Sequence, residues 1–408
     1  MRKIRLFPIA ILAGILFLVD FYAFRELSPL LANLSETNQR IVSSIYWGTS
    51  IFIFVSLLAS IVSSVKAGKL SRALKNSINA QLISFVTKLV YIVVLFIEGV
   101  ITLIFSAFTN EIITSNSEIS SIIGLVVATI PLVAFIHGVT HGKYRYKVHK
   151  QDLFFDDLPE EFDGFKVVQI SDIHAGSFDN EAAVSRGIQM INDQKPDLFV
   201  FTGDLVNNKA DEIVPWMEKF SKIQADFGKY SVLGNHDYGD YIQWDSHHDK
   251  ALNLEHLKKH HAAMGFQLLL DQNAIIRKNG QELALLGVEN WGLGFGERGD
   301  IKKALNGVDQ QDFKLLLSHD PTHWQSIIKE LPTKIHLTLS GHTHGMQFGI
   351  EALGIKWSPV KYRYPHWAGL AEHNHRYLYI NRGFGFLGFS GRVGIWPEIT
   401  VITLRKKQ

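Results

Sequence analysis

The chain has 408 residues, a formal net charge of +2 and no cysteine. Its length suffices for two or three domains, and the absence of cysteine excludes disulfides, thiolate metal sites and cysteine nucleophiles. A net charge near zero and the lack of a long basic run give no sign of nucleic-acid binding, so no nucleic-acid partner is expected.

Composition changes sharply along the chain. Residues 1–142 are rich in Ile, Leu, Val, Phe and Ser, whereas residues 143–408 hold most of the charges and all but two of the 18 histidines. This change predicts a transmembrane region over 1–142, a linker over 143–163 and a folded domain over 164–408.

Four apolar stretches in the first region each approach or exceed the roughly 20 residues that an α-helix needs to cross a bilayer. They are Ile4–Phe24, Ser43–Val65, Leu82–Phe108 and Ile119–Gly142. A cleaved signal peptide is the alternative for the first stretch, but no small-residue cleavage pattern follows it. The sequence therefore predicts an α-helical bundle of four spans.

Two ionisable residues fall inside the third stretch. Lys88 lies near one end, and we expect its side chain to reach the headgroups. Glu98 lies deeper, and we expect it to make a packing hydrogen bond, with an ion path through the bundle as the alternative.

Lysine and arginine are concentrated in alternate flanks of the four stretches. The cation-rich flanks contain Arg2, Lys3 and Arg5, then Lys66, Lys69, Arg72 and Lys75, then Lys143, Arg145, Lys147 and Lys150. The other two flanks contain only Arg25 and Arg40, together with Glu26, Glu36 and Glu111. Because cytoplasmic loops carry the excess of cations, we expect an integral protein of a bacterial inner membrane with its C-terminal domain in the cytoplasm.

Five short apolar runs in the second region have the length and composition of buried strands. They are Lys166–Ile170, Leu198–Thr202, Tyr230–Leu233, Lys314–Leu317 and Ile335–Leu339. Helix-like segments such as Glu181–Gln194 and Ala251–Met264 lie between them, which indicates an α/β domain. In such domains the carboxyl edge of the sheet carries the site.

Each run is followed at once by carboxylate, imidazole or amide side chains. The segments are Asp172-Ile173-His174, Gly203-Asp204, Gly234-Asn235-His236-Asp237, Ser318-His319 and Gly341-His342-Thr343-His344. These side chains bind divalent metals, and two adjacent metals can cleave phosphate esters. Any one of them alone could be a satisfied polar residue, but their recurrence at successive strand ends favours a shared site.

Taken in order, these motifs resemble the calcineurin-like metallophosphoesterase superfamily over about Gly164 to Ile402. The flanking segments Leu158–Lys166 and Arg382–Ile399 resemble its bacterial membrane-associated branch. The resemblance implies that residues 164–408 form two mixed sheets flanked by helices. It also implies hydrolysis of phosphate mono- or diesters by a hydroxide that bridges two metal ions.

The resemblance gives each matched residue a role. Seven would be metal ligands: Asp172, His174 and His344 for one ion, Asn235, His319 and His342 for the other, and Asp204 for both. His236 would protonate the leaving oxygen or stabilise the transferring phosphoryl group, with a structural hydrogen bond as the alternative, and Asp237 would orient it. Oxygen and imidazole ligands favour manganese, iron or zinc over magnesium.

Three further features bear on the surroundings of the site. Met346 stands where the branch commonly has glycine, and we expect it to affect substrate choice. The basic and aromatic stretch Lys356–Trp367 is interpreted as a surface loop, with contact to anionic headgroups as the alternative. A group of histidines between the motifs is expected on a solvated face: His247, His248, His256, His260 and His261.

Together these inferences predict a membrane-anchored, metal-dependent phosphoesterase. An anchor of four helices favours a substrate in the membrane, such as a phospholipid or a lipid-linked nucleotide. A soluble phosphodiester is one alternative, and a role as the cytoplasmic output domain of a membrane sensor is another. No stretch gives a signal for dimerisation.

Overall fold

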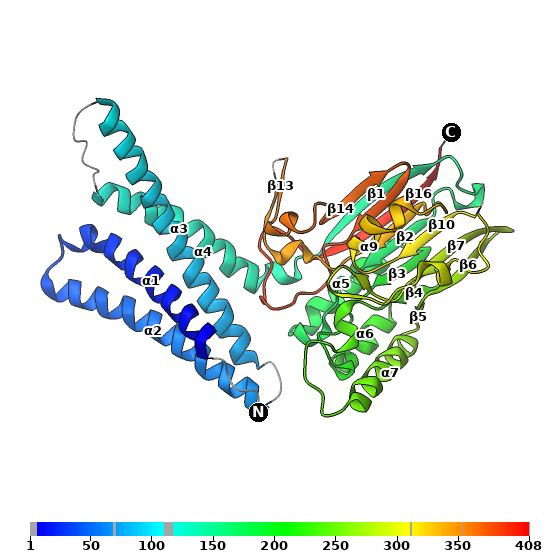
Figure 1. The fold of residues 1–408 in the computed structure, drawn as a ribbon, viewed down its shortest axis with the longest axis horizontal. Coiled ribbons are helices and arrows are strands. Elements are labelled where there is room, and N and C mark those ends of the chain that lie inside the picture. The colour runs from blue at the N-terminus through cyan, green and yellow to red at the C-terminus, as the bar shows by residue number, and fades with distance from the viewer. Residues whose placement is uncertain (1–5, 68–70, 110–116, 311, 353, 408) are drawn as a thin grey trace. The chain divides into compact units, whose positions relative to one another are not determined.

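The computed structural model describes residues 6–67, 71–109, 117–310, 312–352 and 354–407. The chain divides into two compact units, Met1–Thr140 and His141–Gln408 (Figure 1). Several charges used for the orientation prediction lie outside the described residues: Arg2, Lys3, Arg5, Lys69 and Glu111.

The first unit consists of four long helices. They are α1 (Leu6–Leu31), α2 (Glu36–Ala67), α3 (Arg72–Thr109) and α4 (Ser117–Thr140). Large apolar side chains lie on their outer surfaces; Phe52 and Leu103 are both 71% exposed. Among the described residues, three helical segments are long and apolar enough to cross a membrane: Glu36–Ser64, Arg72–Thr109 and Glu118–Thr140. The helix α1 is not among them, and its second half carries Asp20, Arg25 and Glu26.

Lys88 forms an ion pair with Asp20 inside this unit. Its Nζ also lies 2.8 Å from Ser50 Oγ and 4.8 Å from the centre of the Tyr46 ring. The pair neutralises two charges within the helical unit, so Lys88 has a partner inside the protein. That its side chain also reaches the headgroups stays a prediction. Glu98 accepts a hydrogen bond from Thr102 Oγ1 at 3.3 Å, within α3.

The second unit is built on two six-stranded mixed sheets, as predicted. The first has the order β1 (Lys147–Phe155), β16 (Glu398–Lys406), β2 (Lys166–Ile170), β3 (Leu198–Thr202), β4 (Lys229–Val232) and β5 (Gln267–Leu268). The second has the order β14 (Gly369–His373), β15 (Arg376–Ile380), β11 (Leu337–Ser340), β10 (Lys314–Leu317), β7 (Gln281–Gly287) and β6 (Gln272–Lys278). Two short pairs accompany them: β8 (Trp291–Gly292) with β9 (Gly296–Glu297), and β12 (Ile350–Ala352) with β13 (Ile355–Trp357).

Each sheet has a buried face toward the other sheet and a face covered by helices. Val167, Leu198, Leu315 and Leu337 belong to the core between the sheets. Helices α5 (Glu181–Asn192) and α7 (His247–Ala263) pack on the first sheet, and α8 (Ile301–Ala304) and α9 (Pro321–Ser326) pack on the second. Strands β2, β3 and β4 run parallel to one another, as do β10 and β11. Their carboxyl ends therefore carry the following loops to shared edges.

The structure places β1 within residues 143–163, where the sequence suggested a linker. This strand pairs in parallel with β16 along nine residues. It is an edge strand in which only Leu153 and Phe155 are buried. Its sequence therefore lacks the continuous apolar run of a central strand.

His261 is fully buried, which corrects its assignment to a solvated helix face. Its Nδ1 lies 2.9 Å from Ser231 Oγ, and its ring stacks on Phe201 with the centres 6.0 Å apart. The other four histidines of that group are exposed or partly exposed. The helix α7 thus turns one histidine toward the first sheet.

Candidate metal centre

The seven predicted ligands come together from five strand ends that belong to both sheets. Asp172 and His174 follow β2, Asp204 follows β3, Asn235 follows β4, His319 follows β10, and His342 and His344 follow β11. Two neighbouring groups result: Asp172 with His174 and His344, and Asp204 with His319 and His342. Within each group the potential ligand atoms all lie within 4.8 Å of one another.

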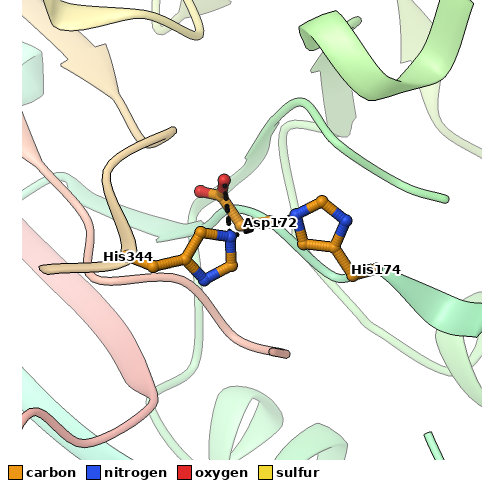
Figure 2. Close-up of side chains that lie close together, drawn as sticks. All are labelled: Asp172, His174 and His344. Carbon is orange, nitrogen blue, oxygen red and sulfur yellow. Dashed lines mark hydrogen bonds and ion pairs between the residues drawn. The ribbon is translucent and has the colours of Figure 1, made fainter. Parts of the chain in front are cut away.

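The first group brings two imidazoles and a carboxylate together (Figure 2). The Nε2 atoms of His174 and His344 lie 3.0 Å apart. The same Nε2 of His344 is 3.2 Å from Asp172 Oδ1. All three residues are buried, so their facing lone pairs are shielded from water and can serve a cation.

Asp204 lies between the two groups. Its Oδ2 is 3.2 Å from His319 Nε2 in the second group and 3.5 Å from His174 Nε2 in the first. Asn235 joins the second group, because its Oδ1 lies 2.9 Å from His342 Nδ1. A carboxylate in this position can contact ions held by either group.

The electrostatics of the second group favour a bound positive charge. His319 Nδ1 lies 2.7 Å from the Thr202 carbonyl oxygen, which turns Nε2 toward Asp204. Burial opposes protonation of His319, but the Asp204 carboxylate outweighs burial and raises the pKa of His319 to about 10. Burial also disfavours ionised Asp204, yet the neighbouring His319 and His236 hold its pKa well below the usual range. The Asp204 side of the second group therefore stabilises positive charge, and the oxygen and imidazole ligands of the group fit divalent metals.

The backbone at the ligands is strained. Five of the seven have positive φ: Asp172 (53°), His174 (46°), Asp204 (61°), His342 (70°) and His344 (50°). Residues other than glycine seldom adopt this conformation, which costs on the order of 1–3 kcal/mol each and persists where the surroundings enforce it. Here the Asp172 N–H donates to the Gly203 carbonyl at 2.9 Å, and the His342 N–H donates to the Asp172 carboxylate at 2.9 Å.

Two glycines allow the ligand loops of the two sheets to approach each other. A β-carbon at Gly341 would lie 1.8 Å from Ser171 Oγ and 2.3 Å from Asp172 Oδ2. Gly203 has a φ of +94°, and a β-carbon there would lie 2.8 Å from His319 Nδ1. Any side chain at these positions would push ligands of different strands apart.

His236 and Asp237 have separate partners. The His236 Nδ1 lies 2.8 Å from the Asn207 carbonyl oxygen, so a main-chain group takes the place of the carboxylate that the sequence suggested. The Asp237 carboxylate instead accepts four main-chain N–H groups at 2.8–3.2 Å, from Gly234, Asp204, Leu205 and Val206. Burial and the nearby Asp204 charge raise the pKa of Asp237 to about 7. Asp237 therefore holds two ligand loops together.

Four residues near the ligands were not predicted. Tyr241 accepts a hydrogen bond from Asn235 Nδ2 at 2.7 Å. The Tyr364 hydroxyl and Asp320 Oδ2 lie 2.8 and 3.3 Å from His342 Nε2, and Arg392 Nη2 lies 3.2 Å from His344 Nδ1. Asp320 directly follows His319, which is a usable signal; the others come from loops with no regular spacing to the motifs.

Comparison with known proteins agrees with this geometry. The family described as "Calcineurin-like phosphoesterase" matches residues 165–346. The "Uncharacterized metallophosphoesterase YkuE" of Bacillus subtilis is 30% identical over 254 residues, which cover 61% of this chain and 82% of that protein. The chain belongs to the calcineurin-like phosphoesterase family. The resemblance inferred from the motifs is thereby confirmed, and family membership makes this phosphoesterase a metal-dependent hydrolase.

The helical region has relatives of its own. Residues 2–143 match "Probable Calcineurin-like phosphoesterase, transmembrane domain". The zebrafish (Danio rerio) "Transmembrane protein with metallophosphoesterase domain" is 27% identical over 308 residues, which cover 73% of this chain and 65% of that protein. The phosphopantetheinyl hydrolase PptH of Mycobacterium tuberculosis aligns at 12% identity over 54% of this chain and 89% of its own, with a TM-score of 0.33, too low to support a shared fold. This phosphoesterase is therefore a membrane-associated member of its family.

Proposed function

We propose that this phosphoesterase hydrolyses phosphate mono- or diesters at a dinuclear metal centre. The observation that carries the proposal is the position of Asp204 Oδ2, within 3.2 and 3.5 Å of imidazole nitrogens from two separate ligand groups. One ion would be held by Asp172, His174 and His344, the other by Asn235, His319 and His342, and both by Asp204. The ligand types favour manganese, iron or zinc.

The protein's own residues support the remaining steps. Two bound divalent ions would activate a water molecule and withdraw charge from the phosphate. As the new P–O bond forms and the ester P–O bond breaks, the leaving oxygen needs a proton. His236 is partly exposed and has Nδ1 occupied by the Asn207 carbonyl, so its Nε2 would donate that proton. Asp237 would keep Asp204 and His236 in register by holding the main chain of both loops.

The charged residues of the helical unit support a proposal for the number of spans and for the side of the membrane on which the catalytic domain lies. We propose that α1 is a fourth span, because its Asp20 is neutralised by Lys88 of α3 and an internal ion pair lowers the cost of a charge in the bilayer. The alternating cations of the sequence support a catalytic domain on the cytoplasmic side of a bacterial inner membrane.

A membrane anchor favours a substrate in the bilayer, either a phospholipid or a lipid-linked nucleotide. A soluble ester is the alternative. Comparing turnover of a lipid ester in nanodiscs with turnover of a soluble ester distinguishes the two.

The test of the general function is hydrolysis by the purified full chain with manganese added. A generic phosphomonoester and a generic phosphodiester are supplied in parallel, and the metal content is measured. We expect turnover of at least one ester, and its loss together with loss of bound metal in His342→Ala. Folded, metal-loaded protein that cleaves neither ester would contradict the proposal.

A further inference from the structure

The hairpin of β12 and β13 has an apolar face that is exposed. Alternate residues of a strand face opposite sides, and cross-strand partners share a side. Ile350 pairs with Trp357 and Ala352 pairs with Ile355, so these four share one face. Ile350 and Ile355 are 50% and 55% exposed. The apolar face of the hairpin is therefore turned to the outside.

The opposite face of the hairpin carries its charges and contacts the catalytic unit. Glu351 accepts a hydrogen bond from Arg382 Nε at 2.9 Å. Lys356 Nζ donates to the Ala368 carbonyl and lies 5.3 Å from the centre of the Trp367 ring. Lys356 remains exposed, so both faces of the hairpin meet the solvent. The apolar face is a candidate contact surface, because it is turned away from these contacts and exposed.

This surface is attached to the candidate metal centre at both ends. The hairpin follows the short helix η7 (His344–Gln347) and leads into η8 (Pro359–Tyr362), and Ser358 Oγ donates to the Gly345 carbonyl at 2.8 Å. Two more large side chains on these flanks are exposed, Met346 at 59% and Tyr362 at 78%. We call Met346, Ile350, Ile355 and Tyr362 the mouth patch.

The charge around the mouth patch is positive. Residues 345–367 contain Lys356, Lys361 and Arg363 but only one acid, Glu351, which is paired with Arg382. Lys361 and Arg363 are both exposed. Apolar side chains next to exposed cations suit the boundary of a bilayer that contains anionic lipids.

The chain itself keeps such a bilayer within reach. The last membrane-compatible helix ends at Thr140 and β1 begins at Lys147. Six residues lie between, which span roughly 20 Å at most.

We propose that the mouth patch docks on the surface of the bilayer that holds the helices. Ile350 and Ile355 enter the boundary between headgroups and acyl chains, and Lys361 and Arg363 contact anionic headgroups. Docking brings the candidate metal centre to lipid esters, and this consequence rests on the proposed function, whereas docking itself does not.

The test uses the absence of cysteine from the chain. Full-length Ile355→Cys is labelled with an environment-sensitive fluorophore and placed in nanodiscs of zwitterionic and anionic lipid that carry a headgroup-level spin-label quencher. The matched control is Leu252→Cys, at a residue of α7 that is 44% exposed. We expect several-fold stronger quenching at position 355 than at 252, and about fivefold weaker docking for each cation removed, as in Lys361→Gln.

Two outcomes would overturn the proposal. One is equal quenching at the two positions. The other is a label at 355 that is shielded from aqueous iodide but not quenched by the lipid, which would mean that a protein surface covers the patch.

A second variant separates docking from catalysis. In Ile355→Ser, hydrolysis of a soluble ester should be unchanged while hydrolysis of an ester in the nanodisc falls. If position 355 is quenched by lipid but the parent protein cleaves no ester, the proposed function fails and docking stands. Equal turnover of the nanodisc ester by the variant and the parent would count against docking.

Discussion

Buried charges are arranged differently in the helical unit and at the candidate metal centre. In the helical unit, Asp20 and Lys88 lie against each other and each side chain is 17% exposed, so the two charges cancel. At the candidate metal centre, carboxylates and imidazoles of four strand ends lie together, and within each group their potential ligand atoms are within 4.8 Å of one another. Charges paired within the chain are already compensated, whereas the grouped carboxylates and imidazoles turn ligand atoms toward one another, an arrangement that favours a cation between them. The two arrangements should therefore respond differently to substitution.

Removing the carboxylate between the two ligand groups should have the largest effect. In Asp204→Asn the shape is kept and the charge is lost, so we expect kcat/KM to fall by about 10⁴-fold, as when one member of a catalytic unit is removed. The exposed Asp211→Asn is the matched control. Steady-state hydrolysis and metal analysis check both, and a fully active, metal-loaded Asp204→Asn would refute a shared role for this carboxylate.

His236 should affect turnover without affecting metal content. Replacing it by Gln removes the proposed proton donor, and we expect kcat to fall by about 10³-fold. Metal content should remain that of the parent, because His236 is outside both ligand groups. Loss of metal in His236→Gln would show that the residue is a ligand instead.

The ion pair of the helical unit should affect stability without affecting chemistry. In Lys88→Leu, Asp20 is left without its partner, and we expect a loss of about 3–5 kcal/mol in the stability of that unit. Adding Asp20→Leu should recover most of the loss. Thermal unfolding in detergent measures both variants, and turnover of a soluble ester should stay unchanged. A single variant as stable as the parent would show that the pair does not stabilise the bundle.

Replacing Asp237 should lower both the stability of the catalytic unit and its metal binding. In the parent protein, the Asp237 carboxylate accepts hydrogen bonds from four main-chain N–H groups. In Asp237→Asn, an NH₂ group replaces one of the two acceptor oxygens, so at least one of these buried N–H groups loses its acceptor. We expect a loss of about 1–3 kcal/mol in stability and weaker metal binding. Asp226→Asn, at an exposed position, is the control. Unchanged thermal unfolding would mean that the four hydrogen bonds are dispensable.

Buried His261 should make the catalytic unit sensitive to acid. Burial lowers its pKa to about 3, so below the ordinary value near 6.5 the unfolded chain binds a proton that the folded state excludes. Stability should therefore fall as the pH drops from about 6.5 toward 3, by up to roughly 1.4 kcal/mol per pH unit. The parent and His261→Phe are compared by unfolding across this range. If the stability of the two proteins changed equally with pH, buried His261 would not be the cause of the acid sensitivity.

The sequence by itself determined the central strands and predicted the residues that come together at the candidate site. Runs such as Lys166–Ile170 and Leu198–Thr202 became β2 and β3 without change of boundary, because strands buried on both faces are apolar throughout and end in glycine or polar residues. The family follows from the same motifs, since their order and spacing reflect ligands at successive strand ends. The sequence did not predict the edge strand β1. Most of its side chains are at least partly exposed, so its sequence has no continuous apolar run and resembles that of a loop.

Only the tertiary structure decided which side chains meet. The Asp20–Lys88 pair joins residues 68 positions apart, and the Tyr364–His342 contact joins two loops of no fixed spacing. Asp237 follows His236 directly yet holds the main chain of another loop. The same is true of the outward apolar face of the β12–β13 hairpin, which follows from the strand register together with the exposure of Ile350 and Ile355. The local sequence pattern determines which residues end a strand. Which distant segments come into contact depends on side-chain packing and on the need of buried polar groups for hydrogen-bond partners.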